Sequence, residues 1–98
     1  MQLVKGLPLV SAWVKSSCPY VVEALARKGS FDAVTLDLQH GLTDLASAAT
    51  NLRIIAASGV SPVVRLTSQD PGHIGRCLDF GAAAVICPMI NTVRIIYK

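Results

Sequence analysis

One pattern occurs four times along the chain and constrains its fold more than any other feature. Short apolar segments begin at residues 8, 33, 62 and 83, and each of the first three precedes a segment of helical periodicity that ends at a glycine. Strands and helices that alternate in this way are typical of βα units, whose strands run parallel in one sheet. The nearly continuous apolar character of the strands indicates that helices cover them. We therefore expect parallel strands at residues 8–14, 33–38, 62–67 and 83–88.

The segments between these strands carry the signals of helix starts and of apolar helix faces. Capping residues and prolines occur at the three expected starts: Ser17 or Cys18 with Pro19, Thr43 or Asp44, and Asp70 with Pro71. The second helix has the clearest apolar stripe, formed by Leu45, Ala48, Ala49, Leu52, Ile55 and Ala56. Shorter faces are expected in the first helix (Val22, Leu25, Ala26) and in the third (Ile74, Cys77, Leu78).

Two architectures are built from such units, the doubly wound sheet and the (β/α)8 barrel. A Rossmann sheet requires a glycine-rich turn after its first strand, and WVKSSCP at residues 13–19 is not one. A flavodoxin-type binding domain is disfavoured because no phosphate-binding loop appears. A TIM barrel needs about 250 residues, whereas this chain has 98. The predicted fold is therefore α/β, the N-terminal half of a (β/α)8 TIM barrel with about four βα units, in which residues 1–98 form a partial domain truncated after strand four.

The composition favours a chain that belongs to something larger. Hydrophobic residues make up 52% of it and charged residues 15%. A small domain has a large surface relative to its volume and needs polar residues to cover that surface. The chain therefore has the composition of the interior of a larger protein or of an oligomer, and its exposed edges at strands one and four would need a partner.

Several functional classes are disfavoured by what the chain does not contain. No basic cluster with interleaved aromatic residues points to nucleic acid, and no apolar run approaches the roughly 18 residues of a membrane span. Lys5 and the apolar residues after it resemble a weak signal peptide, but the same segment fits a first strand. We prefer the strand and expect a cytoplasmic location. Three widely spaced cysteines, Cys18, Cys77 and Cys87, are expected to be free thiols.

Chemically active side chains occur where the strands end. The second strand ends in Asp37, with His40 two residues beyond its last apolar position. The third strand carries Arg65 near its end, and the fourth ends in Pro88 and Met89. The carboxyl ends of parallel strands carry the chemistry of βα proteins, so these residues are expected at one rim. Arginine can bind a carboxylate or an enolate oxygen, and histidine can transfer a proton near neutral pH while an aspartate orients it. The rim therefore suits a small anionic substrate.

Simpler explanations exist for the same residues. His40 could be a surface residue of a loop, and Arg65 could be a structural ion-pair partner of Asp37. Trp13 is most simply a core residue, with a pocket wall as the second choice. Asp79 could be an ordinary polar residue at a helix end, although an acid there is not favoured by the helix dipole.

Two stretches of the chain match a known family. FDAVTLDLQHG and PVVRLTSQDPGHIGRCLDFGAAAVICPMINT resemble the HpcH/HpaI aldolases, and the similarity extends from Trp13 to Thr92. The most specific motifs are D-x-x-H-G, P-V-V-R, D-P, L-D-x-G and P-M-x-N-T, in this order. The family includes 2,4-dihydroxyhept-2-ene-1,7-dioate aldolase and 2-keto-3-deoxy sugar acid aldolases, and its fold is a (β/α)8 barrel.

The resemblance implies a class II aldolase that cleaves or forms a carbon–carbon bond in 2-oxo acids through a pyruvate enolate, with an aldehyde as the second substrate. In the family, the residues matched by His40 and Asp37 are the acid–base pair, and the match of Arg65 binds pyruvate and stabilises its enolate. A divalent ion, Mg²⁺, Mn²⁺ or Co²⁺, holds the 2-oxo acid.

The family match also extends to residues around the pocket. Trp13, Pro88 and Met89 match pocket-lining positions, and Asp79 matches an acid that reaches the site of a neighbouring subunit. The last match implies a homo-oligomer for the full-length form.

This sequence departs from the family pattern at three places. Gln39 stands where the family often has an acid. The metal ligands of the family, a glutamate and an aspartate on later strands, have no counterpart among the 98 residues. The tail VRIIYK, residues 93–98, replaces an acidic, alanine-rich helix start. We therefore expect no bound metal and no aldolase turnover from this chain alone. The alternative is a non-catalytic half barrel that associates with itself or with a separate C-terminal half.

Overall fold

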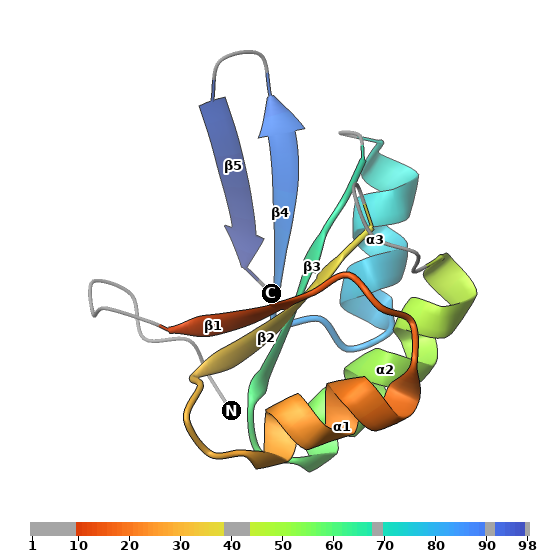
Figure 1. Cartoon of the computed structure of the whole chain (residues 1–98). Helices are drawn as coiled ribbons and strands as arrows, with labels where there is room; N and C mark the ends of the chain where they lie inside the picture. The colour runs from red at the N-terminus through yellow and green to blue at the C-terminus, as the bar shows by residue number, and fades with distance from the viewer. Residues whose placement is uncertain (1–9, 39–43, 68–69, 90–91, 98) are drawn as a thin grey trace.

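The computed structural model describes residues 10–38, 44–67, 70–89 and 92–97. Within them, β1 (Ser11–Val14), β2 (Ala33–Asp37), β3 (Ser61–Arg65), β4 (Ala84–Met89) and β5 (Thr92–Tyr97) form one sheet in sequence order. The helices α1 (Pro19–Arg27), α2 (Leu45–Ala57) and α3 (Pro71–Asp79) connect the first four strands (Figure 1). Strands β1 to β4 are parallel, as the sequence predicted.

The fifth strand was not predicted. β5 pairs antiparallel with β4, with Met89 opposite Thr92 and Ala84 opposite Tyr97. The tail was expected only to depart from a helix start, and its isoleucines and valine have the β-branched side chains that favour strands. The expectation of an exposed edge at strand four is wrong, because β5 covers that edge of β4.

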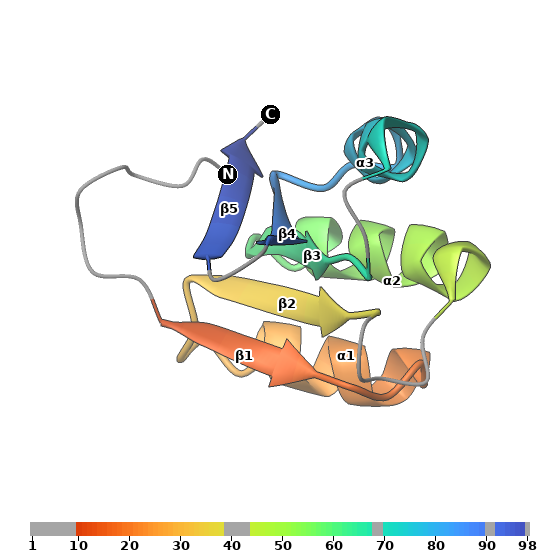
Figure 2. The same cartoon turned by 90° about the horizontal axis from the view of Figure 1, so that it is seen from above.

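The three helices lie on one side of the strands β1 to β3 (Figure 2). Side chains alternate between the two faces of a strand. Val14, Leu36 and Val64 point toward the helices and belong to the main core. Ala33, Val63 and Ala84 point to the opposite face, where they form a second, smaller cluster. The sheet therefore has one face packed under helices and one face that the helices leave uncovered.

Two of the three helix starts have the expected side-chain caps. Cys18 is the N-cap of α1 but its side chain makes no capping hydrogen bond, and Pro19 begins the helix. The carboxylate of Asp44 accepts a hydrogen bond of 2.7 Å from the backbone N–H of Ser47, and that of Asp70 accepts one of 2.8 Å from Gly72. The bond from Ser47 lowers the pKa of Asp44 below its usual value, since it favours the charged form.

The predicted helix faces are confirmed with one exception. Ala48, Leu52 and Ile55 of α2 are buried, whereas Ala56 is exposed. Ala56 lies about 80° around the helix from Ala48, at the margin of the buried stripe. Asn51 is buried within the stripe although it is polar.

Two further sequence expectations concern the thiols and the membrane. Cys18, Cys77 and Cys87 are free, as predicted, and the last two are buried. Burial and the nearby Cys87 raise the pKa of Cys77 to about 11. Among the described residues, no helix has both the length and the apolar character needed to cross a membrane.

Candidate active site

Three strand ends bring Trp13, Asp37 and Arg65 to the sheet face that the helices leave uncovered. Asp37 is the last residue of β2 and lies opposite Arg65, the last residue of β3. Trp13 is the penultimate residue of β1. Each of the three adjoins a residue that faces the helical core, so strand alternation turns all three to the other side. The carboxyl edge of the sheet therefore carries an indole, a carboxylate and a guanidinium on neighbouring strands.

Asp37 is the centre of this group. Only 1% of its surface is exposed. The indole N–H of Trp13 donates a hydrogen bond of 2.9 Å to Oδ2 of Asp37. Nε of Arg65 lies 3.7 Å from Oδ1 of the same carboxylate. A buried carboxylate is stable only when it is paired and hydrogen-bonded, and these two contacts supply both conditions.

Trp13 and Arg65 also contact one another. The guanidinium carbon of Arg65 lies 5.5 Å from the centroid of the Trp13 ring, within the range of a cation–π interaction. Trp13 is 43% exposed and the side chain of Arg65 is 25% exposed, whereas Asp37 lies beneath them. The group therefore presents an aromatic surface and a positive charge outward, which suits a small anion with an apolar part.

The structure bears on two of the alternatives from the sequence. The interpretation of Trp13 as a core residue is wrong, because it lies on the uncovered face and is partly exposed. The second choice, a position on a pocket wall, stays a prediction. The ion pair between Arg65 and Asp37 is present. The pair still leaves part of the guanidinium side chain accessible, so it is compatible with anion binding.

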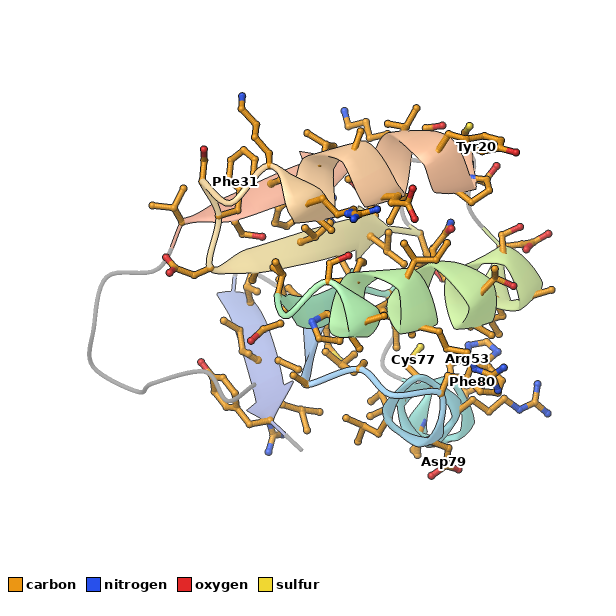
Figure 3. The ribbon with its side chains drawn as sticks, turned by 90° about the horizontal axis from the view of Figure 1, so that it is seen from below. Tyr20, Phe31, Arg53, Cys77, Asp79 and Phe80 are labelled. Atoms are coloured by element: carbon orange, nitrogen blue, oxygen red, sulfur yellow. The ribbon has the colours of Figure 1, made fainter. Side chains whose placement is uncertain are left out.

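Most of the remaining predicted site residues either lie outside the described part of the chain or are described only in their backbone. His40 and Gln39 lie outside the described residues. Pro88 and Met89 end β4, where their backbone pairs with β5, and their side chains are also outside the description. Asp79 is the exposed last residue of α3 and points away from the sheet (Figure 3).

Sequence reasoning missed two polar contacts near the site. The hydroxyls of Ser11 and Thr35 lie 2.8 Å apart on the uncovered face, deeper than Asp37 along the strands. The side-chain amide of Asn51 donates a hydrogen bond of 3.1 Å to the carbonyl of Ser17, which ties α2 to the segment that follows β1. A polar residue inside the apolar stripe of α2 was the only signal for the second contact.

A family model described as HpcH/HpaI aldolase/citrate lyase matches residues 9–97. The chain belongs to this family. Its relatives include a hydroxypyruvate/pyruvate aldolase of Rhizorhabdus wittichii, which is 39% identical over 88 residues, 90% of this chain and 35% of the relative. A 4-hydroxy-2-oxo-heptane-1,7-dioate aldolase of Escherichia coli is 34% identical over 91% of this chain and 34% of the relative. This HpcH/HpaI chain thus spans about a third of the length of these relatives.

Solved structures of the family confirm the predicted fold class. An HpcH/HpaI family protein from Burkholderia cenocepacia superposes with a TM-score of 0.76 and 34% identity, over 87% of this chain and 34% of that one. The strands β1 to β4 and their helices are therefore about four βα units of a TIM barrel. The names of the relatives place lyase chemistry of the aldolase type in the family.

The HpcH/HpaI aldolases generally depend on a divalent metal ion. The part of this chain that the structure describes contains no group of three or more His, Cys, Asp or Glu side chains able to hold such an ion. Asp37 is the acid at the carboxyl edge, and its two described contacts are donors, an indole and a guanidinium. The described residues therefore do not fit a metal site.

Proposed function

We propose that this chain supplies the pyruvate-binding part of a metal-dependent class II aldolase, which forms or cleaves a carbon–carbon bond in 2-oxo acids. One observation carries the proposal: Trp13, Asp37 and Arg65 converge at the carboxyl ends of three neighbouring parallel strands. In barrel proteins this edge carries the active site. The names of the relatives, aldolases of pyruvate and of a hydroxy-oxo dioate, indicate the substrate class.

Each residue has a defined role in the proposal. Arg65 binds the carboxylate of the 2-oxo acid, since a guanidinium can offer paired donors to a planar anion. Its charge also favours the enolate that forms when the methyl group loses a proton. His40 carries that proton, and Asp37 orients the imidazole. Trp13, Pro88 and Met89 line the pocket around the substrate.

The metal belongs to the complete enzyme in this proposal. A glutamate and an aspartate on later strands of the barrel would hold Mg²⁺, Mn²⁺ or Co²⁺, and the ion would hold the 2-oxo acid. We therefore expect the chain to bind a 2-oxo acid without catalysing an aldol reaction. Asp79 is proposed to reach a neighbouring subunit in a homo-oligomer, and an aldehyde would be the second substrate.

Calorimetric titration of the chain with pyruvate tests this function. We expect binding to the unmodified chain and loss of binding in Arg65→Ala. Arg53→Ala is the matched control, because Arg53 is an exposed arginine on α2. Binding of equal strength by Arg65→Ala and Arg53→Ala would contradict the assignment of Arg65.

One observation favours a second function, a non-catalytic half barrel that associates with itself. Val93, Ile95 and Tyr97 point to the same face of β5, and they are 67%, 47% and 51% exposed. Contiguous exposed apolar surface on an edge strand favours association. Light scattering at increasing concentration tests this function: a dimer that Ile95→Lys converts to a monomer supports it, and a monomer at all concentrations excludes it.

A further inference from the structure

We propose that Trp13 is a positioning residue, which holds the carboxylate of Asp37 and the guanidinium of Arg65 in a fixed relative orientation. The positioning role itself is independent of the proposed function. Only the identity of the bound substrate, a 2-oxo acid, rests on that function. The contacts that carry it are the 2.9 Å hydrogen bond to Asp37 and the ring contact at 5.5 Å to Arg65.

One indole makes both contacts, and it uses different parts of the ring for each. The N–H lies in the plane of the ring and donates to Oδ2 of Asp37. The face of the ring lies against the guanidinium of Arg65. Since Nε of Arg65 also approaches Oδ1 of Asp37, each of the three groups contacts the other two. Rotation of any one of them disrupts two contacts.

Trp13 and Arg65 are on strands that are not neighbours. β2 lies between β1 and β3, so the two side chains together must span one strand to make contact. Neighbouring strands are about 4.8 Å apart, which places β1 and β3 about 9.6 Å apart. Ser11, on the same face of β1, contacts Thr35 on β2. The side chains of Trp13 and Arg65 meet across this distance, with the guanidinium carbon 5.5 Å from the ring centroid.

Core packing does not explain Trp13. Its neighbours Ala12 and Val14 are buried under the helices, whereas Trp13 is 43% exposed on the other face. Exposure of a large aromatic side chain forgoes much of the stabilisation that burial would give. The polar and cationic contacts of the indole therefore account for its position, and both contacts go to residues of the candidate site.

The orientation has a direct consequence for binding. A guanidinium fixed by a ring face and by a carboxylate loses little conformational freedom when an anion arrives, and preorganisation of this kind raises affinity. Without the indole, the side chain of Arg65 would have more conformational freedom before binding and would lose more of it when the anion binds. We expect pyruvate to bind about threefold more weakly to Trp13→Phe, which keeps a ring face, and about tenfold more weakly to Trp13→Leu, which keeps neither contact.

The chain contains a single tryptophan, so its indole N–H gives one resonance in a ¹⁵N correlation spectrum. We expect this resonance to shift in Asp37→Asn, because the acceptor loses its charge. We also expect the Nε–H of Arg65, assigned with Arg65→Lys, to exchange with water faster in Trp13→Leu and in Trp13→Phe. Tyr20→Leu is the control, since Tyr20 is an aromatic residue of α1 that is 81% exposed.

The outcomes separate this inference from the proposed function. The Asp37→Asn variant leaves Trp13 itself unmodified. If the indole N–H resonance is identical in this variant and in the unmodified chain, the positioning role is overturned. Unchanged exchange of Arg65 Nε–H in the folded Trp13→Phe variant also overturns it. If both signals change and the unmodified chain binds no pyruvate, the positioning role holds and the proposed function fails. If Arg65→Ala abolishes binding and both Trp13 variants bind normally, the function holds and the positioning role fails.

Discussion

Asp37 and Arg65 occupy paired positions at the carboxyl ends of β2 and β3, with Nε of Arg65 3.7 Å from Oδ1 of Asp37. The acid is buried, whereas a quarter of the arginine side chain is accessible. A negative charge inside the protein is thus balanced by a positive charge that still contacts solvent. The guanidinium of Arg65 can therefore pair with Asp37 and bind an anionic ligand at the same time.

We expect Asp37→Asn to lower the free energy of unfolding by about 1–3 kcal/mol, because the charge that faces Arg65 and the charged acceptor of the indole are both lost. The measurement is urea denaturation followed by the fluorescence of Trp13. Asp79→Asn, which changes an exposed acid of α3, should remain close to the unmodified chain. Equal stability of the two variants would show that the buried charge contributes nothing.

The pKa of Cys77, raised to about 11, predicts a loss of stability in alkali. The thiol of the unfolded chain ionises near its ordinary value of 9.0, whereas burial keeps the folded thiol protonated. Folding therefore retains a proton that the unfolded state releases, and the free energy of unfolding should fall as the pH rises from 9 toward 11. Urea midpoints across this range measure the effect. In Cys77→Ala the free energy of unfolding should fall less steeply with pH. An equally steep fall in this variant would refute the role of Cys77.

The lowered pKa of Asp44 predicts the opposite dependence in acid. Its carboxylate caps α2, so the folded state favours the charged form. The contribution is present above the ordinary pKa of 3.8 and is lost as the pH falls through the lower folded pKa. Asp44→Asn keeps a capping side chain without the charge. The unfolding temperature of this variant should fall less than that of the unmodified chain as the pH is lowered. The same fall in both proteins would argue against the charged cap at Asp44.

Asn51→Ala should lower the free energy of unfolding by about 1–3 kcal/mol, because the carbonyl of Ser17 loses its donor. Hydrogen exchange should also become faster in the segment between β1 and α1. Thr50→Ala is the control, since Thr50 is the exposed neighbour of Asn51 on α2. Matching exchange rates in the two variants would mean that Asn51 does not anchor this segment.

His40→Ala tests the acid–base role that the sequence implies. In a complex of this chain with a complementary C-terminal half, we expect the variant to slow metal-dependent exchange of the pyruvate methyl protons by about 10²–10⁴-fold. His73→Ala is the matched control, because His73 is the other histidine of the chain and lies on α3. Full exchange in the His40→Ala complex would remove His40 from the mechanism.

The sequence predicted the features that depend on neighbouring residues. The parallel strands and the caps at Asp44 and Asp70 follow from local spacing and capping chemistry. The residues at the carboxyl edge were also identified, because the topology brings successive strand ends together. Their roles as catalytic and binding residues remain proposals.

The features that the sequence did not predict depend on distant partners. β5 exists through its pairing with β4, and a repeat of βα units gave no reason to expect an antiparallel strand. The position of Trp13 depends on contacts with β2 and β3, whereas strand alternation alone leaves either face open for it. Asn51 is buried because the carbonyl of Ser17 is nearby, and no pattern within α2 reveals that carbonyl.

The pairing of β4 has a mechanical consequence for the rim. β4 pairs with β5 along its whole length, from Ala84 to Met89, but the paired positions with β3 run only as far as Ile86, opposite Arg65 (Figure 1). Just beyond that pair, the backbone N–H of Leu66 donates a hydrogen bond of 2.9 Å to the carbonyl of Ile86, and β4 then continues in its pairing with β5. Arg65 lies at the end of the paired positions between β3 and β4, and Pro88 and Met89 lie beyond them along β4. The backbone positions of Pro88 and Met89 are therefore set by β5 and not by the strand that carries Arg65.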